Sequence, residues 1–359
     1  MPRLTIAVVS EQRSSYLQDG FSQEDCAALT HDGEVEGIVT TLKKLGHHVV
    51  LVRGIRSLVQ HLANSGERDW DLVFNIAQGF FGSAREAQVP ALLEAYEIPY
   101  TFADAATIAL CQNKSITKIV LDHHHIPSAP FTVISTSKHN ISDCILDSGS
   151  LTFPLFVKLA TEGSSKGVDS FSKVDSPAEL RTAVKKLAFR FPDHEILVES
   201  FLAGREFTVS LLGTGPLSRV IGVREHVWQE SSSSDHENSD PDTQNFASWQ
   251  SKSSRDFQLK IKDYNIQETT DPQIHAACLL ALETWAVLDC RDAGRVDIRF
   301  DSCKADSTPF VLEVNPIAGL LPGLSPLPAS AEANGISFEE LLVEIIESAL
   351  LRISAVQKN

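Results

Sequence analysis

The sequence predicts an α/β protein whose first third forms a parallel, doubly wound sheet. Short apolar segments alternate there with amphipathic segments of helical period. Strands separated by helices in this way pair in parallel, and the helices cover both faces of the sheet. In chain order we expect strands at 4–9, 48–52 and 71–77, and helices at 34–46 and 85–96.

The remaining two thirds mix helices and strands without this regular alternation. A helical pair is expected around 104–124, and helices follow near 272–289 and 337–353. The strands expected in this part are 131–135, 154–160, 196–202, 205–212 and 219–225. Residues 230–244, with the sequence ESSSSDHENSDPDTQ, are polar, acidic and low in complexity, which predicts a loop or an insertion.

Composition and charge narrow the class of partner. The chain has 359 residues, 43% of them hydrophobic, and a formal net charge of -16. That charge argues against a nucleic-acid or anionic-membrane surface, although a local basic cleft for phosphates is compatible with it. The apolar part of the N-terminus is too short for a signal peptide, and no run is long enough to span a membrane. Six cysteines without a CxxC pair predict reduced thiols and a cytoplasmic location.

The segment 295–320 contains two strand-like runs joined by a polar loop. In the first run Val296, Ile298 and Phe300 form one face, and the second run shows the same alternation at 310, 312 and 314. The polar stretch 303–307 between them predicts a hairpin.

Polar side chains lie on the other face of this hairpin. If the turn centres near residue 305, Asp297 lies opposite Glu313, and Arg295 lies opposite Asn315. Carboxylates directly across a strand pair repel each other, so we expect a positive group between them.

Two further stretches have the composition of nucleotide-binding segments. Lys158 precedes a Gly-Ser loop, GSSKG at 163–167, whose backbone N–H groups could cradle a phosphate. Glu199 ends one strand and Glu206 begins the next, where carboxylates could bind adenine and ribose. Taken alone, the first stretch is more often a plain turn, and the second favours two exposed glutamates near a turn.

Six blocks in order resemble the ATP-grasp superfamily and, within it, the D-alanine–D-alanine ligase family. The blocks are VPALLEAYEIPYT, NKSITK, VKLATEGSSKG, VESFLAGREFTV, GRVDIRF and LEVNPIAGL. The resemblance implies a three-domain ATP-grasp fold, with ATP held between the central and C-terminal α+β domains. The expected domains are an N-terminal Rossmann-like domain at 1–112, a central subdomain with the phosphate loop at 113–208, and a C-terminal subdomain with the metal site at 209–359.

The resemblance also implies a role for individual residues. Lys114 and Lys158 match the lysines that hold the ATP phosphates, and Ser164 and Ser165 match the lid over them, with Ser164 also near the substrate. The remaining matches are Glu199, Ser200 and Leu202 for adenine, Glu206 for ribose, Asp297, Glu313 and Asn315 for two Mg²⁺ ions (or Mn²⁺), and Arg295 with the Gly319 backbone N–H for the developing oxyanion.

The implied reaction is ATP-dependent ligation of a carboxylate to an amine. ATP phosphorylates the carboxylate, and the amine then attacks the acyl phosphate, giving an amide, ADP and phosphate. The expected substrates are small molecules, namely amino acids that need not be D-alanine, with no nucleic acid and no membrane involved. A homodimer is left open. The alternatives are a non-ligase ATP-grasp phosphotransferase and a non-catalytic nucleotide-binding protein.

Several positions in the substrate-binding half depart from the family pattern. Gln78 stands where these ligases usually have histidine, and Arg85 and Glu86 replace a more acidic, glycine-bearing stretch. Lys252 aligns with a phosphate contact, but a serine follows it where a tyrosine is expected, and Ser325 sits about one position away from its match. The N-terminal acid that orients substrate could be any of three residues, which are Asp32, Glu34 and Glu36.

Overall fold

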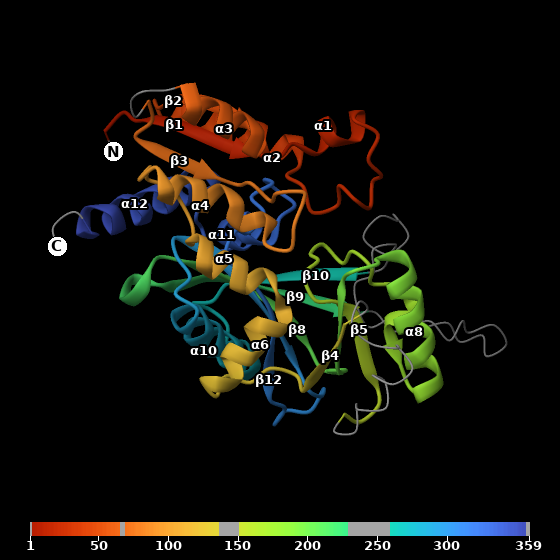
Figure 1. Cartoon of the computed structure of the whole chain (residues 1–359). Coiled ribbons are helices and arrows are strands. Elements are labelled where there is room, and N and C mark those ends of the chain that lie inside the picture. Colours follow the sequence, from red (N-terminus) through yellow and green to blue (C-terminus); the bar gives the residue numbers. More distant parts are fainter. Residues whose placement is uncertain (1, 65–68, 136–150, 229–258, 357–359) are drawn as a thin grey trace.

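The computed structural model describes residues 2–64, 69–135, 151–228 and 259–356. Three β-sheets organise this part of the chain, and helices lie between and around them (Figure 1). Two sequence expectations, the polar loop at 230–244 and the phosphate contact at Lys252, lie outside the described residues.

The first sheet is parallel and has the strand order β2-β1-β3. Its strands are β1 (Thr5–Ser10), β2 (His48–Arg53) and β3 (Leu72–Asn75). Ile6 and Val8 of β1 pack in one core with α2 (Asp32–Lys44), while the alternate residues Ala7 and Val9 pack in another with α3 (Gly54–Asn64) and α4 (Gln88–Ala95). Both faces are therefore covered, which confirms the doubly wound arrangement.

The second sheet is antiparallel, with the order β4-β7-β5-β6. It consists of β4 (Phe131–Ser135), β5 (Leu155–Leu159), β6 (Lys173–Val174) and β7 (Glu195–Ser200). One helix, α8 (Pro177–Arg190), covers it through Leu180, Val184 and Leu187, spaced three to four residues apart on one face. Ser176 caps this helix by accepting a hydrogen bond from the N–H of Glu179.

The third sheet is also antiparallel and has the order β10-β9-β8-β11-β12. Its strands are β8 (Glu206–Leu212), β9 (Arg219–Trp228), β10 (Leu259–Tyr264), β11 (Ala293–Phe300) and β12 (Pro309–Asn315). Helix α10 (Pro272–Val287) packs on it through the fully buried Trp285, close to Gly294 of β11. The strands of the three sheets lie within residues 5–75, 131–200 and 206–315, so β8 begins before the expected boundary at 208.

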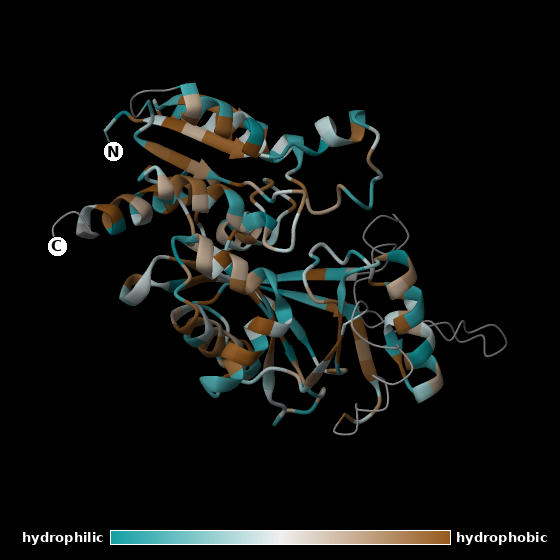
Figure 2. Ribbon diagram, in the orientation of Figure 1, coloured by the Kyte–Doolittle hydropathy of each residue, from teal (hydrophilic) through white to brown (hydrophobic). Residues whose placement is uncertain are grey.

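Further helices connect the sheets. They are α1 (Arg13–Gln18), η1 (Arg85–Ala87), α5 (Ala105–Gln112), α6 (Lys114–His123), η3 (Ser170–Ser172), η4 (Gly215–Leu217), α11 (Pro326–Ala333) and α12 (Phe338–Val356). The last of these, α12, packs back against α2 and the first sheet, so the two ends of the chain share one core. Figure 2 shows the hydrophobic residues on the strands of the first sheet. In the described part of the chain, no helix is long and apolar enough to cross a membrane.

The hairpin of β11 and β12 has the predicted register at the end that carries the polar residue pairs. Asp297 pairs with Glu313, and Arg295 pairs with Asn315. The apolar faces do not match throughout, because a bulge after Asp297 places Ile298 opposite Val311 instead of residue 312. A bulge adds one residue to one strand. It therefore allows both the carboxylate pair and the buried Ile298–Val311 pair to form.

One buried carboxylate ties the third sheet to the α4–α5 connection and to α12. Asp292, fully buried, accepts hydrogen bonds from the N–H of Phe102 at 2.7 Å and from Arg352 of α12 at 2.9 Å. Two hydroxyls also donate to it, from Thr214 at 3.1 Å and Ser348 at 2.9 Å. A single side chain thus joins the α4–α5 connection, the β8–β9 connection and α12.

Replacing Asp292 with alanine should lower the free energy of unfolding by about 3–5 kcal/mol, because Arg352 loses its partner in a mostly buried position. Glu339→Ala is the matched control in the same α12 region. It removes an exposed carboxylate that pairs with Lys44 and should cost less than about 1 kcal/mol. Urea denaturation of the two variants measures both values. Equal destabilisation by both changes would contradict the role given to Asp292.

Candidate active site

The candidate site lies around the facing carboxylates of β11 and β12. Asn315 donates to Asp297 Oδ2 across 3.3 Å, and its amide nitrogen is 3.5 Å from Glu313 Oε1. Thr208 of the neighbouring strand β8 donates its hydroxyl to Asp297 Oδ1 at 2.7 Å. Three strands therefore fix the orientation of the two carboxylates.

Side-chain cations flank this pair. Lys114, at the first position of α6, places its Nζ 3.3 Å from Glu313 Oε2. Arg295 places its Nε 3.4 Å from Asp297 Oδ2 and its Nη2 4.0 Å from Glu313 Oε1. Lys114 and Arg295 thus supply part of the positive charge that was expected between the facing carboxylates.

The two carboxyl groups titrate differently. Burial raises the pKa of Asp297 to about 6, and Glu313 adds to this effect while Arg295 opposes it. Burial would also raise the pKa of Glu313, but Lys114 and Arg295 outweigh it and hold that pKa below its usual range. At neutral pH the site therefore contains an ionised Glu313 and an Asp297 that is easily protonated.

A second group of charges lies on the central sheet. Glu199 forms ion pairs with Lys158 at 2.5 Å and with Lys118 at 2.8 Å, and all three side chains are almost fully buried. Burial alone would raise the pKa of Glu199, but the two lysines lower it to about 2. The sequence interpretation did not include Lys118. Its spacing of four residues from Lys114, on the same face of a helix, is the signal that could have indicated it.

The remaining nucleotide-binding candidates follow Glu199 along the chain. Ser200 is half-buried at the end of β7, and Leu202 is buried in the connection to β8. Glu206 begins β8 and accepts a hydrogen bond from Arg299 Nη1 at 3.0 Å. These residues lie on the connection between the second and third sheets, next to the Lys158–Glu199 pair.

The Gly-Ser loop follows β5 and has an unusual backbone. Ser164 and Ser165 adopt φ values of 52° and 59°, and Gly167 adopts 76°. Non-glycine residues in this left-handed region are uncommon and cluster at ligand-binding positions. Ser164 is exposed, while Lys166 Nζ lies 3.7 Å from Glu162 Oε2. The loop begins beside Lys114, which donates to the carbonyl of Glu162 at 2.7 Å.

The segment after β12 carries Gly319 and connects the site to the N-terminal region. Glu34 Oε1 accepts a hydrogen bond from the N–H of Leu320 at 2.6 Å. Of the other two N-terminal candidates, Asp32 accepts from Ser14, and Glu36 is exposed. Glu34 is thus the candidate acid that contacts the Gly319 segment.

The substrate candidates from the first domain lie on one loop. Arg85 is buried, with its Nη2 3.4 Å from Glu162 Oε2, and Gln78 is half-buried earlier on the same loop. Burial raises the pKa of the neighbouring Glu86, although Arg85 and Lys114 oppose it.

Ser325 accepts a hydrogen bond from the N–H of Leu321 at 3.1 Å, and a side chain added at Gly319 would approach its Oγ to 3.0 Å. Ser325 is thus placed beside Gly319.

The donor set fits magnesium that is shared with phosphates. Among the described residues there is no group of three or more His, Cys, Asp or Glu side chains arranged to hold a metal. The set at the hairpin consists of two carboxylates and one amide. Magnesium in enzymes is typically bound by one or two carboxylates, with water and substrate phosphates completing the octahedron. The oxygen-rich, partly buried pair Asp297–Glu313 meets this requirement.

Comparisons with known proteins identify the family of the chain. Residues 120–347 match the family model described as D-ala D-ala ligase C-terminus. The D-alanine–D-alanine ligase of Polaromonas naphthalenivorans is 32% identical over 280 residues, which cover 77% of each chain. That of Cupriavidus taiwanensis is 29% identical over 315 residues, covering 88% of this chain and 86% of the relative. The crystal structure of the Bacillus anthracis enzyme complexed with ATP superposes with a TM-score of 0.70 and 20% identity, covering 99% of each chain.

The fold and the site define an ATP-grasp enzyme, an ATP-dependent ligase that forms amide bonds. The chain belongs to the D-alanine–D-alanine ligase family.

The raised pKa of Asp297 leads to a pH-dependent metal affinity. An acid with a pKa of about 6 is mostly ionised at pH 7 and about one tenth ionised at pH 5, and only the ionised form binds a hard cation well. Mn²⁺ should therefore bind about tenfold more weakly at pH 5 than at pH 7, as measured by electron paramagnetic resonance without nucleotide. Asp297→Asn should bind weakly at both pH values. Equal affinity of the wild-type protein at both pH values would contradict the shifted pKa.

Proposed function

We propose that the protein joins two amino acids, phosphorylating the carboxylate of one with ATP before the amine of the other attacks. The observation that carries this proposal is the convergence of Lys114, Lys158 and Arg295 around Asp297 and Glu313. A non-catalytic protein would need only the cluster of buried charges that holds the nucleotide. It would not need a second cluster of buried charges. The ligase class of the family also disfavours a phosphotransferase.

In the first step a carboxylate oxygen of one amino acid attacks the γ-phosphorus of ATP. A phosphorus–oxygen bond forms, the bond to the bridging oxygen breaks, and ADP departs. Lys114 and Lys158 neutralise the phosphate oxygens as this charge moves. We assign adenine to Glu199, Ser200 and Leu202, and ribose to Glu206. We assign closure over the phosphates to Ser164 and Ser165, with Lys252 as a further phosphate contact.

In the second step the amine nitrogen of the other amino acid attacks the acyl carbon. The resulting oxyanion is placed next to Arg295 and the N–H of Gly319, which stabilise its charge. Collapse of the tetrahedral intermediate expels phosphate, and the nitrogen loses a proton to give the amide. Exclusion of water matters because water would otherwise hydrolyse the acyl phosphate.

We propose that Asp297, Glu313 and Asn315 hold two Mg²⁺ ions, which would neutralise phosphate charge and orient the transferring group. Their fit is supported by the two facing carboxylates, whose mutual repulsion a cation relieves. Placing these carboxylates together is unfavourable for the stability of the fold, but it creates a binding site for a cation.

The substrate pair is proposed to be amino acids other than two D-alanine molecules. The curated relatives are named for D-alanine, but the loop of Gln78, Arg85 and Glu86 departs from the family pattern. We propose that Glu34 is the N-terminal acid that supports the substrate segment, through its bond to Leu320, with Ser325 on the other side of Gly319. We also propose a cytoplasmic location, in keeping with the ATP requirement and with the free cysteines of the described part of the chain.

The direct test is a screen of ATP-dependent phosphate release over pairs of D- and L-amino acids, with products identified by mass. We expect ADP, phosphate and a dipeptide in equal amounts for at least one pair. ATP hydrolysis without any amide product across the whole screen would contradict the ligase proposal for this chain.

Replacing Lys158 with alanine should weaken ADP and ATP binding by roughly 1.5–3 kcal/mol, the contribution of a charged phosphate contact. The fold should persist, because Glu199 keeps its ion pair with Lys118. Lys185→Ala, on the exposed face of α8, is the control with the same change of charge and should bind normally. Calorimetric titration measures all three proteins. Unchanged affinity in the Lys158 variant would exclude it from the nucleotide site.

A further inference from the structure

A cavity of about 220 Å³ lies between the first domain and the Gly-Ser loop. Glu162 connects it to the site described above. The carboxylate of this residue lines the cavity, while its backbone carbonyl accepts a hydrogen bond from Lys114 at 2.7 Å. Lys114 in turn lies 3.3 Å from Glu313 Oε2. The cavity is therefore connected to the proposed phosphoryl-transfer centre through Glu162 and Lys114.

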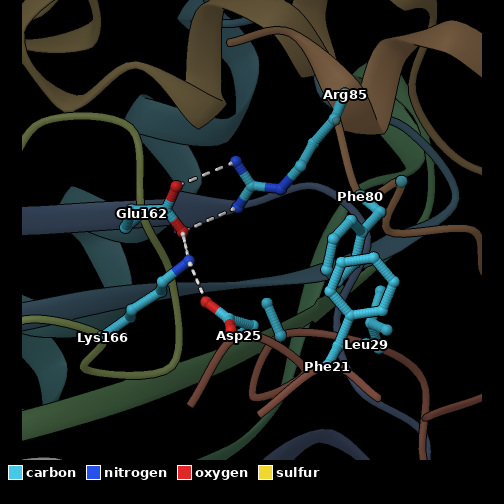
Figure 3. Close-up of a pocket in the computed structure, with 9 residues that line it drawn as sticks. Phe21, Asp25, Leu29, Phe80, Arg85, Glu162 and Lys166 are labelled. Atoms are coloured by element: carbon cyan, nitrogen blue, oxygen red, sulfur yellow. Dashed lines mark hydrogen bonds and ion pairs between the residues drawn. The ribbon is translucent and has the colours of Figure 1, made fainter. Parts of the chain in front are cut away.

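One wall of the cavity is aromatic and apolar. Phe21, Leu29 and Phe80 form it, and Figure 3 shows their side chains on the side opposite Glu162 and Lys166. The rings of Phe21 and Phe80 are 4.6 Å apart, and Tyr16 stacks on Phe80 at 4.7 Å. These rings form a surface cluster away from the hydrophobic cores, and Phe21 keeps 36% of its surface exposed. Exposed aromatic rings beside a cavity are typical of a ligand-binding surface.

The opposite wall is charged, and its ion pairs are long. Arg85 lies 3.4 Å from Glu162, and Lys166 lies 3.7 Å from Glu162 and 4.0 Å from Asp25. Strong charge-assisted hydrogen bonds between such groups are about 2.7–2.9 Å long. These groups are therefore held loosely enough to contact the non-reacting end of a substrate. The cations could contact the α-carboxylate of the amino acid that supplies its amine, or the acids could contact the α-ammonium group of the one that supplies its carboxylate.

The backbone fixes the two walls relative to each other. Gly79 adopts a φ of 60°, and a Cβ at this position would lie 2.3 Å from the carbonyl oxygen of Arg85. Only glycine allows the chain to pass so close. This contact sets the loop so that Phe80 and Arg85 both face the cavity.

The volume of the cavity indicates which class of substrate side chain fits it. A cavity of about 150 Å³ with apolar walls accommodates benzene. The present cavity is larger, so a phenyl ring fits it, whereas the methyl group of alanine would leave most of it empty. An incoming ring would also extend the existing cluster with the tilted and stacked geometries that aromatic rings favour.

We infer that one of the two amino acids joined by this enzyme has an aromatic side chain, which binds in the cavity between Phe80 and the Arg85–Glu162 pair. This inference rests on the proposed ligase function of the same site. It assigns Phe21 and Phe80 to substrate selection, whereas Arg85 and Glu162 contact the polar end of the substrate.

The test compares phenylalanine with alanine, each as D and L enantiomers, in the full-length enzyme. We expect kcat/KM in ATP-dependent ligation to be at least about tenfold higher for one phenylalanine enantiomer than for alanine, which is the discrimination typical of hydrophobic pockets. Calorimetry with a non-hydrolysable ATP analogue and Mg²⁺ should show the same preference in Kd. Phe80→Ala should reduce the preference to less than threefold. Phe81→Ala, which changes a 59% exposed ring of the same cluster outside the cavity lining, should preserve it.

The outcomes separate the two proposals. Ligation of alanine at least as efficient as that of phenylalanine would overturn the inference and leave the ligase function intact. The inference would also be wrong if Phe80→Ala and Phe81→Ala changed the preference equally. Absence of amide product with every amino acid would overturn the ligase function. In that case phenylalanine binding no tighter than alanine in the calorimeter would independently overturn the cavity assignment.

Discussion

The two carboxylates that face each other across β11 and β12 impose the constraint on which the rest of the site depends. Asp297 and Glu313 repel each other, and burial makes this repulsion costly. Lys114 and Arg295 offset part of it, leaving Glu313 ionised and Asp297 easy to protonate. A hairpin that needed only to be stable would carry apolar side chains, or side chains of opposite charge, at these two positions. The arrangement is understandable when cations and phosphates complete it.

The architecture brings separate charged groups to this point. Helix α6 supplies Lys114 from its first turn, and β5 supplies Lys158, which pairs with Glu199 of the adjacent strand β7. Lys158 also lies close enough to Glu313 to lower its pKa. The second and third sheets thus contribute opposite sides of the proposed nucleotide site. The first domain closes the remaining side through Glu34 and the loop that carries Arg85.

Local periodicity was sufficient to predict most strands, the doubly wound first domain and the register of Asp297 with Glu313. The bulge after Asp297 was not predictable, because it arises from satisfying the polar face and the buried Ile298–Val311 pair together. Helices α1, α3, α8 and α11 and strands β6 and β10 were missed. In the site, the ordered motifs predicted the nucleotide residues, and these assignments stay predictions. Lys118 was missed although its spacing from Lys114 was visible, whereas the Phe80 cavity was not predictable because its lining residues are distant in the sequence.

The measurement that tests the central claim most directly is made on Glu313→Gln, which keeps the shape of the side chain and removes its charge. If these carboxylates serve phosphoryl transfer, ATP-dependent phosphate release should fall by about two orders of magnitude or more, the typical effect of losing one preorganised electrostatic contact. Two effects on stability oppose each other in this variant, because Lys114 loses its ion-pair partner while the repulsion between Glu313 and Asp297 is removed. The thermal unfolding midpoint without Mg²⁺ should therefore change by only a few degrees, which corresponds to about 1 kcal/mol in a domain of this size. A variant that unfolds at a much lower temperature yet turns over at a near-normal rate when folded would contradict the account.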